Sequence, residues 1–408
     1  MDPIRNPYAP GAGQRPPELA GRDAELDGFD VVLRRVGNGR PERSMVLTGL
    51  RGVGKTVLLN AMRSLAVRRG WGTGKLEVRP DQSLRRPLAA ALHVAVRELG
   101  GPGERTEDAL GVIRAFVERE AGSSAKLRDR WNPGITVPPA VGRGDSGDIE
   151  IDLVEVLSDL GGLAADRASG IALFFDELQD LGPDDVSALC AACHELGQLG
   201  LPLIVVGAGL PHLPAVLSAS KSYSERLFRY ARIDRLDREA ADRALSAPAA
   251  EEGAAFEPEA LERLYAVTSG YPYFLQAYGK VTWDVAVTSP ITAADIDVAV
   301  PQAEAELAVG FFGSRYERAT PAERDYLRAI ADATPNAPSP DAASARDRTA
   351  AGDGTAATAQ VAKLLGRSAQ SLSPARDALI KKGLIYSGHR GRVAFTVPHF
   401  GAYLRTQT

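Results

Sequence analysis

The first 235 residues alternate between short apolar runs and longer segments with apolar residues at helical spacing. Apolar runs of this length, bounded by polar residues, are typical of buried strands. The predicted strands lie at 44–48, 75–79, 171–175, 201–209 and 230–234. The predicted helices between them lie at 57–65, 84–99, 106–120, 149–165, 183–199 and 218–229. Because parallel strands need helical crossovers, this alternation predicts an α/β core around a five-stranded, mainly parallel sheet.

The pattern changes after residue 235, where helical stretches continue without strands. An all-α lid is predicted from four such stretches, at 237–250, 258–268, 271–287 and 292–306. Further helices are predicted at 320–333, 356–366 and 371–382, followed by a β-hairpin at 383–397 with a basic tip. Two helices joined by a turn and followed by a basic hairpin predict a winged helix-turn-helix domain.

Two segments lack the pattern of packed structure. Residues 334–354 are mostly Pro, Ala, Ser, Asp and Gly, so we expect this insert to be disordered. Residues 122–147 are polar and rich in Gly and Pro, and they predict a long loop. The predicted domains are a core at 1–235 with an N-terminal arm, a lid at 236–306, and a winged-helix domain at 307–408 that carries the insert.

The segment Gly49–Thr56 fits the G-x-x-x-x-G-K-[ST] pattern of a P-loop, directly between a predicted strand and a predicted helix. Glycines let main-chain N–H groups turn towards phosphates, and the helix start adds its positive end. Lys55 would reach the β- and γ-phosphates of ATP, and the Thr56 hydroxyl would hold Mg²⁺. An ordinary glycine-rich turn is the alternative. The predicted nucleotide contacts in this segment are Gly49, Gly52, Val53, Gly54, Lys55, Thr56 and Val57.

The apolar run Ile171–Phe175 ends in Asp176 and Glu177, as the Walker B pattern requires. We expect this strand in the middle of the sheet, beside the P-loop strand. Asp176 would then hold Mg²⁺, and Glu177 would act as the general base that polarises the attacking water. Many strands end in an acid, so this prediction depends on its combination with the P-loop.

Composition limits the alternatives. The 408 residues are 44% hydrophobic and 25% charged, as in soluble globular proteins, and no apolar run approaches the roughly 18 residues that span a bilayer. With no apolar secretory segment at the N-terminus and only two cysteines, we expect a cytoplasmic protein. Cys190 and Cys193 form one C-x-x-C without a second pair, which favours core thiols over a metal or redox site.

The formal net charge of -4 does not point to nucleic acid, but its distribution does. Residues 355–408 hold eight Lys or Arg and a single acid, Asp377, although a solvated basic face would give the same count. The second helix of the predicted winged helix would enter a DNA major groove, and the hairpin tip would reach phosphates or the minor groove. The predicted DNA contacts are Gln370, Ser371, Arg376, Arg390 and Arg392.

Together these motifs resemble the AAA+ and STAND branches of the P-loop ATPases, in particular the group with a core, a helical lid and a C-terminal winged helix. Origin-recognition-type initiators and archaeal-type switch ATPases share this plan. By resemblance, Gly21–Leu26 is similar to the adenine-side motif of the group, which implies a nucleotide contact for Arg22. Gly270-Tyr271-Pro272 is similar to the G-x-P motif, whose proline contacts adenine. A plain N-terminal helix and a simple helix junction are the alternatives.

Two departures from the family pattern bear on activity. The segment Gly207–Gly209 carries no Asn, Ser or Thr where relatives place a first sensor, and no arginine occupies the lid sensor position near Gly270. Both departures favour a slow switch over a fast ATPase. Arg226 or Arg229 is similar in position to an arginine finger that completes a neighbour's site, and we assign the role to Arg226. An arginine that satisfies a helix end is the alternative.

The first hypothesis is a slowly hydrolysing ATPase that couples its nucleotide state to the placement of a DNA-binding winged helix. The second is a STAND-type signalling switch whose winged helix binds protein or acts as an autoinhibitory clamp. A hexameric unfoldase is less favoured, because the region of the second strand carries no aromatic-glycine pore loop. The expected partners are ATP or ADP, Mg²⁺, double-stranded DNA, a second copy of the chain and an unidentified protein, without a membrane.

Overall fold

The computed structural model describes the chain except residues 12, 102, 122–134, 222, 335–354, 388–390, 398 and 408. The insert predicted at 334–354, apart from its first residue, and half of the loop predicted at 122–147 therefore lie outside the described residues. Contacts divide the chain into two compact units. The sheet unit comprises Arg22–Gly49 and Lys55–Ile233, and the lid unit comprises Met1–Gly21, Leu50–Gly54 and Asp234–Thr408.

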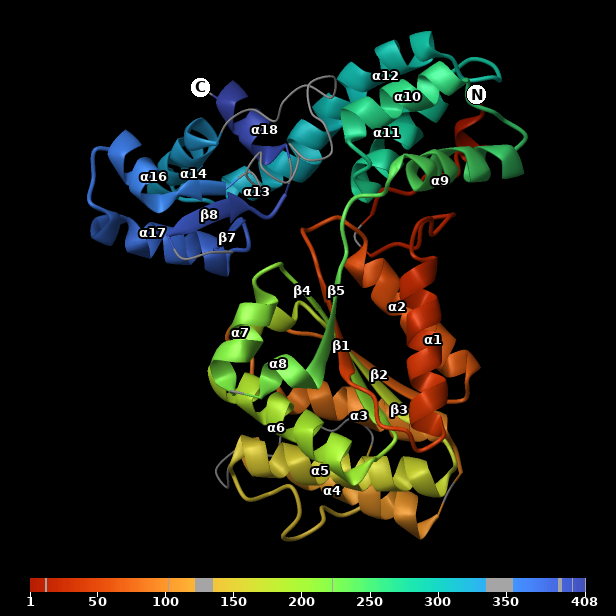
Figure 1. Ribbon diagram of the computed structural model, residues 1–408, viewed down its shortest axis with the longest axis vertical. Coiled ribbons are helices and arrows are strands. Elements are labelled where there is room, and N and C mark those ends of the chain that lie inside the picture. The colour runs from red at the N-terminus through yellow and green to blue at the C-terminus, as the bar shows by residue number, and fades with distance from the viewer. Residues whose placement is uncertain are drawn as a thin grey trace. The chain divides into compact units, whose positions relative to one another are not determined.

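The sheet unit contains five parallel strands in the order β2-β3-β4-β1-β5 (Figure 1). Their bounds are β1 (Ser44–Thr48), β2 (Gly72–Glu77), β3 (Ile171–Asp176), β4 (Leu203–Gly209) and β5 (Phe228–Arg232). The predicted parallel sheet is confirmed, but the expected neighbour of β3 is wrong. The β3 strand pairs with β2 and β4, so the strand that ends in Asp176 does not lie beside β1. An apolar run predicts a buried strand without fixing its neighbour, and β4, buried at every residue, takes the central position.

Alternate residues of the strands face two different layers of helices. Phe174 packs against Phe29 of α1 (Asp23–Gly37), with ring centroids 6.1 Å apart. Phe175 instead belongs to the large core on the other face. Figure 1 shows α1 and α2 (Lys55–Arg68) on one side of the sheet. The other α-helices described in this unit are α3 (Arg85–Leu99), α4 (Glu104–Ala121), α5 (Ile149–Asp166), α6 (Pro183–Leu199), α7 (Leu213–Ser220) and α8 (Ser224–Leu227).

A buried ion pair joins the helices between β2 and β3. Asp152 of α5 is fully buried and accepts a hydrogen bond from Nη2 of Arg85 of α3 at 2.6 Å. It also accepts hydrogen bonds from the main-chain N–H of Ser146 at 2.7 Å and of Gly147 at 3.2 Å. Burial raises the pKa of the Asp152 carboxyl, but the hydrogen bonds from Ser146 and Arg85 outweigh burial and hold the pKa below its usual value. The Arg85 guanidinium also lies 4.7 Å from the ring centroid of Phe116 on α4, so one cation connects three helices.

The lid helices lie where the sequence predicts them. They are α9 (Arg238–Glu251), α10 (Pro258–Thr268), α11 (Pro272–Val285) and α12 (Ala293–Glu306). An N-terminal arm packs along α9 and α11 within the lid unit. Its Tyr8 hydroxyl donates to the Leu245 carbonyl at 2.6 Å, and its ring packs edge-on against Trp283. The Asn6 amide of the arm donates to Asp284 Oδ1 at 2.8 Å.

The C-terminal part of the lid unit contains helices and a small antiparallel sheet. After a π-helical segment η4 (Leu307–Gly313), its helices are α13 (Ser314–Glu317), α14 (Pro321–Ala333), α16 (Thr358–Leu364), α17 (Ala369–Lys381) and α18 (Phe400–Thr406). Its strands are β6 (Thr355–Ala357), β7 (Ile385–Tyr386) and β8 (Arg392–Phe395), and β8 pairs with both others. The two helices and the hairpin predicted from the sequence are present, although β6 replaces the start of the first helix. Within the described ranges, no helix is both long enough and apolar enough to cross a membrane.

Candidate functional site

The P-loop lies between β1 and α2, as predicted. The N–H of Gly49 donates to the Gly209 carbonyl of β4 at 3.1 Å, which anchors the start of the loop. Gly52 and Gly54 have φ angles of +89° and +92°, where a side chain would be strained. Glycines in such conformations turn successive N–H groups towards one side of the chain, where they can bind an anion. The loop backbone therefore has the form that phosphate binding requires.

Lys55 opens α2 and is only 6% exposed. Its Nζ donates to the Gly49 carbonyl at 2.8 Å, so the ammonium lies over the loop rather than in solvent. Thr56 and Val57 follow in the first turn, where main-chain N–H groups have no partner inside the helix. A buried cation beside the N–H groups of a helix start suits a polyphosphate, so Gly49, Lys55, Thr56 and Val57 fit the assigned role.

The acidic pair lies at the carboxyl end of β3. Asp176 is the last residue of the strand and is 7% exposed. Glu177 follows with φ 53° and ψ 43°, a left-handed conformation that is rare for residues other than glycine. Its N–H donates to Asp176 Oδ1 at 3.1 Å. Since β3 and β1 are both parallel to β4, the acidic pair and the P-loop begin at the same edge of the sheet. A carboxylate and a hydroxyl at this edge are ligands that Mg²⁺ prefers.

Sequence reasoning missed Gln179 at this edge. It lies in a short 3-10 turn, η3 (Leu178–Asp180), two residues after Glu177. The Gln179 side chain donates to Glu177 Oε2 at 2.7 Å and accepts from the N–H of Leu210 at 3.1 Å. Gly207 and Gly209 at the end of β4 are the sequence signal that could have pointed to it, because glycines in a strand often mark the close approach of another segment.

Residues Leu50–Gly54, the apex of the P-loop, belong to the lid unit. The Tyr271 hydroxyl donates to the Arg51 carbonyl, and the N–H of Tyr273 donates to the Gly52 carbonyl at 3.2 Å. The N–H of Arg51 donates to the Thr396 carbonyl, just after β8, at 3.0 Å. The apex of the P-loop is therefore bonded both to the start of α11 and to the C-terminal sheet.

The two residues assigned to adenine lie in different units. Arg22 is buried directly before α1 in the sheet unit, and Pro272 is the first residue of α11 in the lid unit. Gly270 has φ +70° and its N-terminal neighbour Ser269 is also left-handed, which explains the chain reversal between α10 and α11. A proline in the first turn is also what a simple helix junction requires. The adenine contacts of Arg22 and Pro272 remain predictions.

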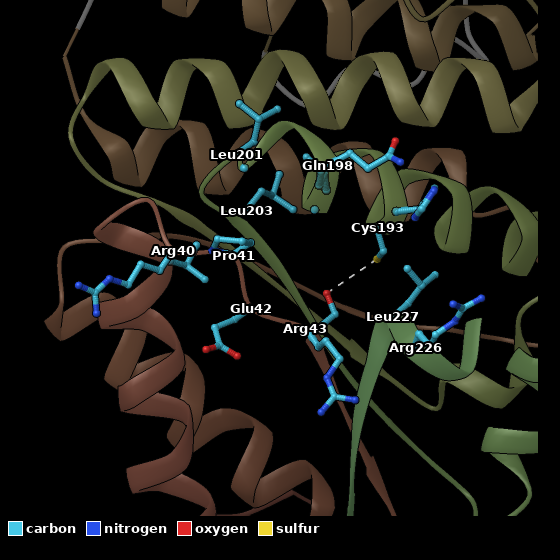
Figure 2. A pocket seen from close by; sticks show the side chains of 16 residues that line it. Arg40, Pro41, Glu42, Arg43, Cys193, Gln198, Leu201, Leu203, Arg226 and Leu227 are labelled. Atoms are coloured by element: carbon cyan, nitrogen blue, oxygen red, sulfur yellow. Dashed lines mark hydrogen bonds between the residues drawn. The ribbon is translucent and has the colours of Figure 1, made fainter. Parts of the chain in front are cut away.

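Arg226 lies at the opposite edge of the sheet from the P-loop. It belongs to α8, directly before β5, and is exposed. A hollow of about 430 Å³ opens there, near the amino ends of β1 and β4. Figure 2 shows Arg40, Arg43 and Arg226 on its rim, pointing away from one another. Arg226 thus lies far along the strands from the P-loop of its own chain, and its action on a neighbouring copy remains a prediction.

The predicted DNA contacts lie on α17 and at β8. Gln370 and Ser371 are exposed in the first turn of α17. Arg376 forms an ion pair with its neighbour Asp377 at 2.9 Å, and Arg392 donates to the Thr355 carbonyl at 2.9 Å. Both arginines therefore have partners within the domain. Arg390, predicted at the hairpin tip, lies outside the described residues.

A protein-family model matches most of the sheet unit. The AAA ATPase domain matches residues 18–206, a range that includes both the P-loop and the acidic pair. Residues 18–206 are an AAA+ ATPase domain. A second family, described as a domain of unknown function, matches residues 309–404. A comparison with curated proteins finds no match.

The ATPase domain and the rest of the chain are also similar to solved structures. The Walker-type ATPase of Pyrococcus abyssi has a TM-score of 0.58 and 16% identity, and the match covers 96% of this chain and 97% of that chain. This likeness shows the fold. The Orc1 protein of Aeropyrum pernix in complex with DNA has a TM-score of 0.45 and 15% identity, over 96% of this chain and 94% of that chain. Cdc6p from Pyrobaculum aerophilum has a TM-score of 0.45 and 14% identity, and the match covers 99% of this chain and 97% of that chain. TM-scores below 0.5 support no conclusion about this chain.

Proposed function

We propose that the chain binds ATP with Mg²⁺ at the P-loop and hydrolyses it slowly. One observation carries the proposal: a buried Lys55, in a glycine loop of suitable conformation, lies at the same sheet edge as Asp176 and the left-handed Glu177. A left-handed conformation outside glycine costs about 1–3 kcal/mol, and strain of this kind clusters at functional sites. The AAA ATPase match over residues 18–206 supports the same interpretation.

Each residue then has a distinct task. Main-chain N–H groups of Gly54, Lys55 and Thr56 would bind phosphate oxygens, and the Lys55 ammonium would neutralise their charge. The Thr56 hydroxyl and Asp176 would hold Mg²⁺, which supplies charge neutralisation between the phosphates. Glu177 would accept a proton from the attacking water. Glycine and alanine at the end of β4 offer no polar side chain to the γ-phosphate, which supports a slow rate.

The experiment compares Lys55→Ala with a matched control, Lys75→Ala. Lys75 lies on β2 of the same unit, and its Nζ donates to Asn60 at 2.6 Å, outside the P-loop. We expect Lys55→Ala to lose at least about tenfold in affinity for a fluorescent ATP analogue, while Lys75→Ala keeps wild-type affinity. Glu177→Gln should bind ATP and fail to hydrolyse it. If Lys55→Ala binds ATP as tightly as wild type, the proposed site is wrong.

We further propose that nucleotide state controls the C-terminal domain. The supporting observation is that the apex of the P-loop is hydrogen-bonded to both Tyr271 and Thr396. Any rearrangement of the loop on nucleotide binding must therefore alter contacts to α11 and to the C-terminal sheet. Hydrogen exchange at the N–H of Arg51, measured with ADP, with ATP and without nucleotide, tests this coupling. Identical exchange in all three states would contradict it.

The output of the switch has two candidates, of which we propose DNA binding first. Exposed Gln370 and Ser371 on α17 and the basic composition of 355–408 support a winged helix that binds duplex DNA. The bond from Arg51 to Thr396 favours the second candidate, a clamp that holds the P-loop. Duplex binding over a salt series discriminates the two, because phosphate contacts make affinity fall steeply with salt. If DNA is bound, Arg376→Ala should reduce the slope of log affinity against log salt concentration by about one. Absence of salt-dependent binding would favour the clamp.

A further inference from the structure

Gln179 occupies the space that a polar sensor on β4 would fill. Its side chain bridges two elements, donating to Glu177 Oε2 at 2.7 Å and accepting from the N–H of Leu210 at 3.1 Å. A main-chain N–H can bond only to the oxygen of a carboxamide, so the NH₂ group must face Glu177. The orientation of the Gln179 amide is therefore fixed by its two partners together.

The glycines at the end of β4 are explained by this contact. A Cβ at Gly209 would lie 2.7 Å from Gln179 Oε1, and a Cβ at Gly207 would lie 2.6 Å from a terminal methyl of Leu178. Both distances are shorter than real Cβ contacts, so side chains at 207 and 209 would displace the side chains of Leu178 and Gln179. The strand end lacks a polar side chain because Leu178 and Gln179 already cover it.

We propose that Gln179 is a positioning residue for ATP hydrolysis, an inference that rests on the proposed function. Its NH₂ group donates to one oxygen of the Glu177 carboxylate and thereby restricts the orientation of the group that would accept a proton from water. Through Leu210 it also ties this carboxylate to β4, the strand between β3 and the P-loop strand. The neutral amide of Gln179, in the η3 turn, thus orients the general base. The end of β4 could not do so, because Gly207, Ala208 and Gly209 have no polar side chain.

Two substitutions separate the two hydrogen bonds of Gln179. Gln179→Glu has nearly the same shape and keeps an acceptor for Leu210, but it replaces the donor to Glu177 by a like charge. Gln179→Met keeps the volume and loses both bonds. Gln198→Met is the matched control, since Gln198 lies at the opposite edge of the sheet beside the hollow in Figure 2.

Three measurements are made on each full-length variant: kcat and KM for ATP, affinity for a fluorescent ATP analogue, and hydrogen exchange at the Leu210 amide without nucleotide. We expect both Gln179 variants to lose at least about tenfold in kcat, with KM and affinity within about twofold of wild type. The Leu210 amide should exchange faster in Gln179→Met and stay protected in Gln179→Glu. Gln198→Met should match wild type throughout.

The inference is overturned if Gln179→Glu keeps wild-type kcat, because the donor to Glu177 is then not needed. It is also overturned if affinity falls together with kcat in both variants, which would mark a residue that only supports the fold. Failure of the proposed function looks different. In that case wild type does not turn over ATP and Lys55→Ala binds the analogue as tightly as wild type, whatever the Gln179 variants do.

Discussion

A methyl group at two glycines of the P-loop should have unequal effects. Gly52 and Gly54 share nearly the same backbone, with φ +89° and +92°. A Cβ at Gly52 would lie 2.9 Å from Cε1 of Tyr271 and 3.3 Å from the Cβ of Tyr273. A Cβ at Gly54 would meet nothing within 4 Å. Gly54→Ala therefore isolates the backbone strain, and Gly52→Ala adds the collision with the start of α11.

The magnitudes follow from these contacts. A left-handed conformation costs a residue with a Cβ about 1–2 kcal/mol. Carbon atoms pack best at about 3.5–4.0 Å, and forcing an extra methyl into a packed site costs about 1–3 kcal/mol. We expect Gly54→Ala to lower the free energy of unfolding by about 1–2 kcal/mol and Gly52→Ala by about 2–5 kcal/mol.

Urea unfolding of the nucleotide-free protein measures both effects. Gly52 and Tyr271 belong to the lid unit, which contains the buried Trp283. In a background where the other two tryptophans, Trp71 and Trp131, are replaced by Phe, the fluorescence of Trp283 follows this unit. Equal transition midpoints for Gly52→Ala and Gly54→Ala would refute the packing of Tyr271 on the loop.

A double-mutant cycle removes the remaining ambiguity. In a Tyr271→Ala background the 2.9 Å collision is gone and the 3.3 Å approach to the Cβ of Tyr273 remains, so the excess cost of Gly52→Ala over Gly54→Ala should shrink. An excess at Gly52 that stays unchanged without the Tyr271 ring would mean that this ring is not its cause.

The remaining predictions concern stability and thiol reactivity. Asp152→Ala should lower the free energy of unfolding by about 3–5 kcal/mol in chemical denaturation, because it leaves the buried Arg85 unpaired. Since the pKa of Asp152 is held below its usual value, its contribution is present above the ordinary carboxyl range of about pH 4 and is lost as the pH falls through the folded value. Tyr8→Phe should cost about 1 kcal/mol in thermal unfolding by removing the arm's hydrogen bond to α9. Burial raises the pKa of the fully buried Cys190 to about 11, so iodoacetamide at pH 8 should alkylate Cys190 only after unfolding, as mass spectrometry will show.

Local patterns predicted the elements well where burial alone shapes the sequence. The apolar run predicts a buried strand here, and the strand Ile171–Asp176 is buried at every residue. The lid helix α10 begins and ends at the predicted residues, Pro258 and Thr268. Such elements depend on their own periodicity, which a single sequence carries.

The pairing of segments that are distant in the chain could not be predicted from local sequence patterns. The sequence predicts Ala356 and Ala357 at the start of a helix because alanine favours helices, yet they pair with β8 and belong to a strand. The β3 strand is separated from β1 by β4, and no local sequence pattern encodes this strand order. The role of Gln179 escaped notice for the same reason, since Leu210 lies 31 residues away.

The division of the P-loop between two units suggests how much free energy a nucleotide could control. Its ends, Gly49 and Lys55, belong to the sheet unit, while Leu50–Gly54 belong to the lid unit. Three hydrogen bonds join this apex to Tyr271, Tyr273 and Thr396. At about 1 kcal/mol each, they amount to about 3 kcal/mol, which corresponds to roughly a hundredfold change in an equilibrium. Under the proposed switch, a phosphate that breaks these bonds would change the contacts of the apex with the start of α11 and, through the bond to Thr396 alone, with the C-terminal sheet.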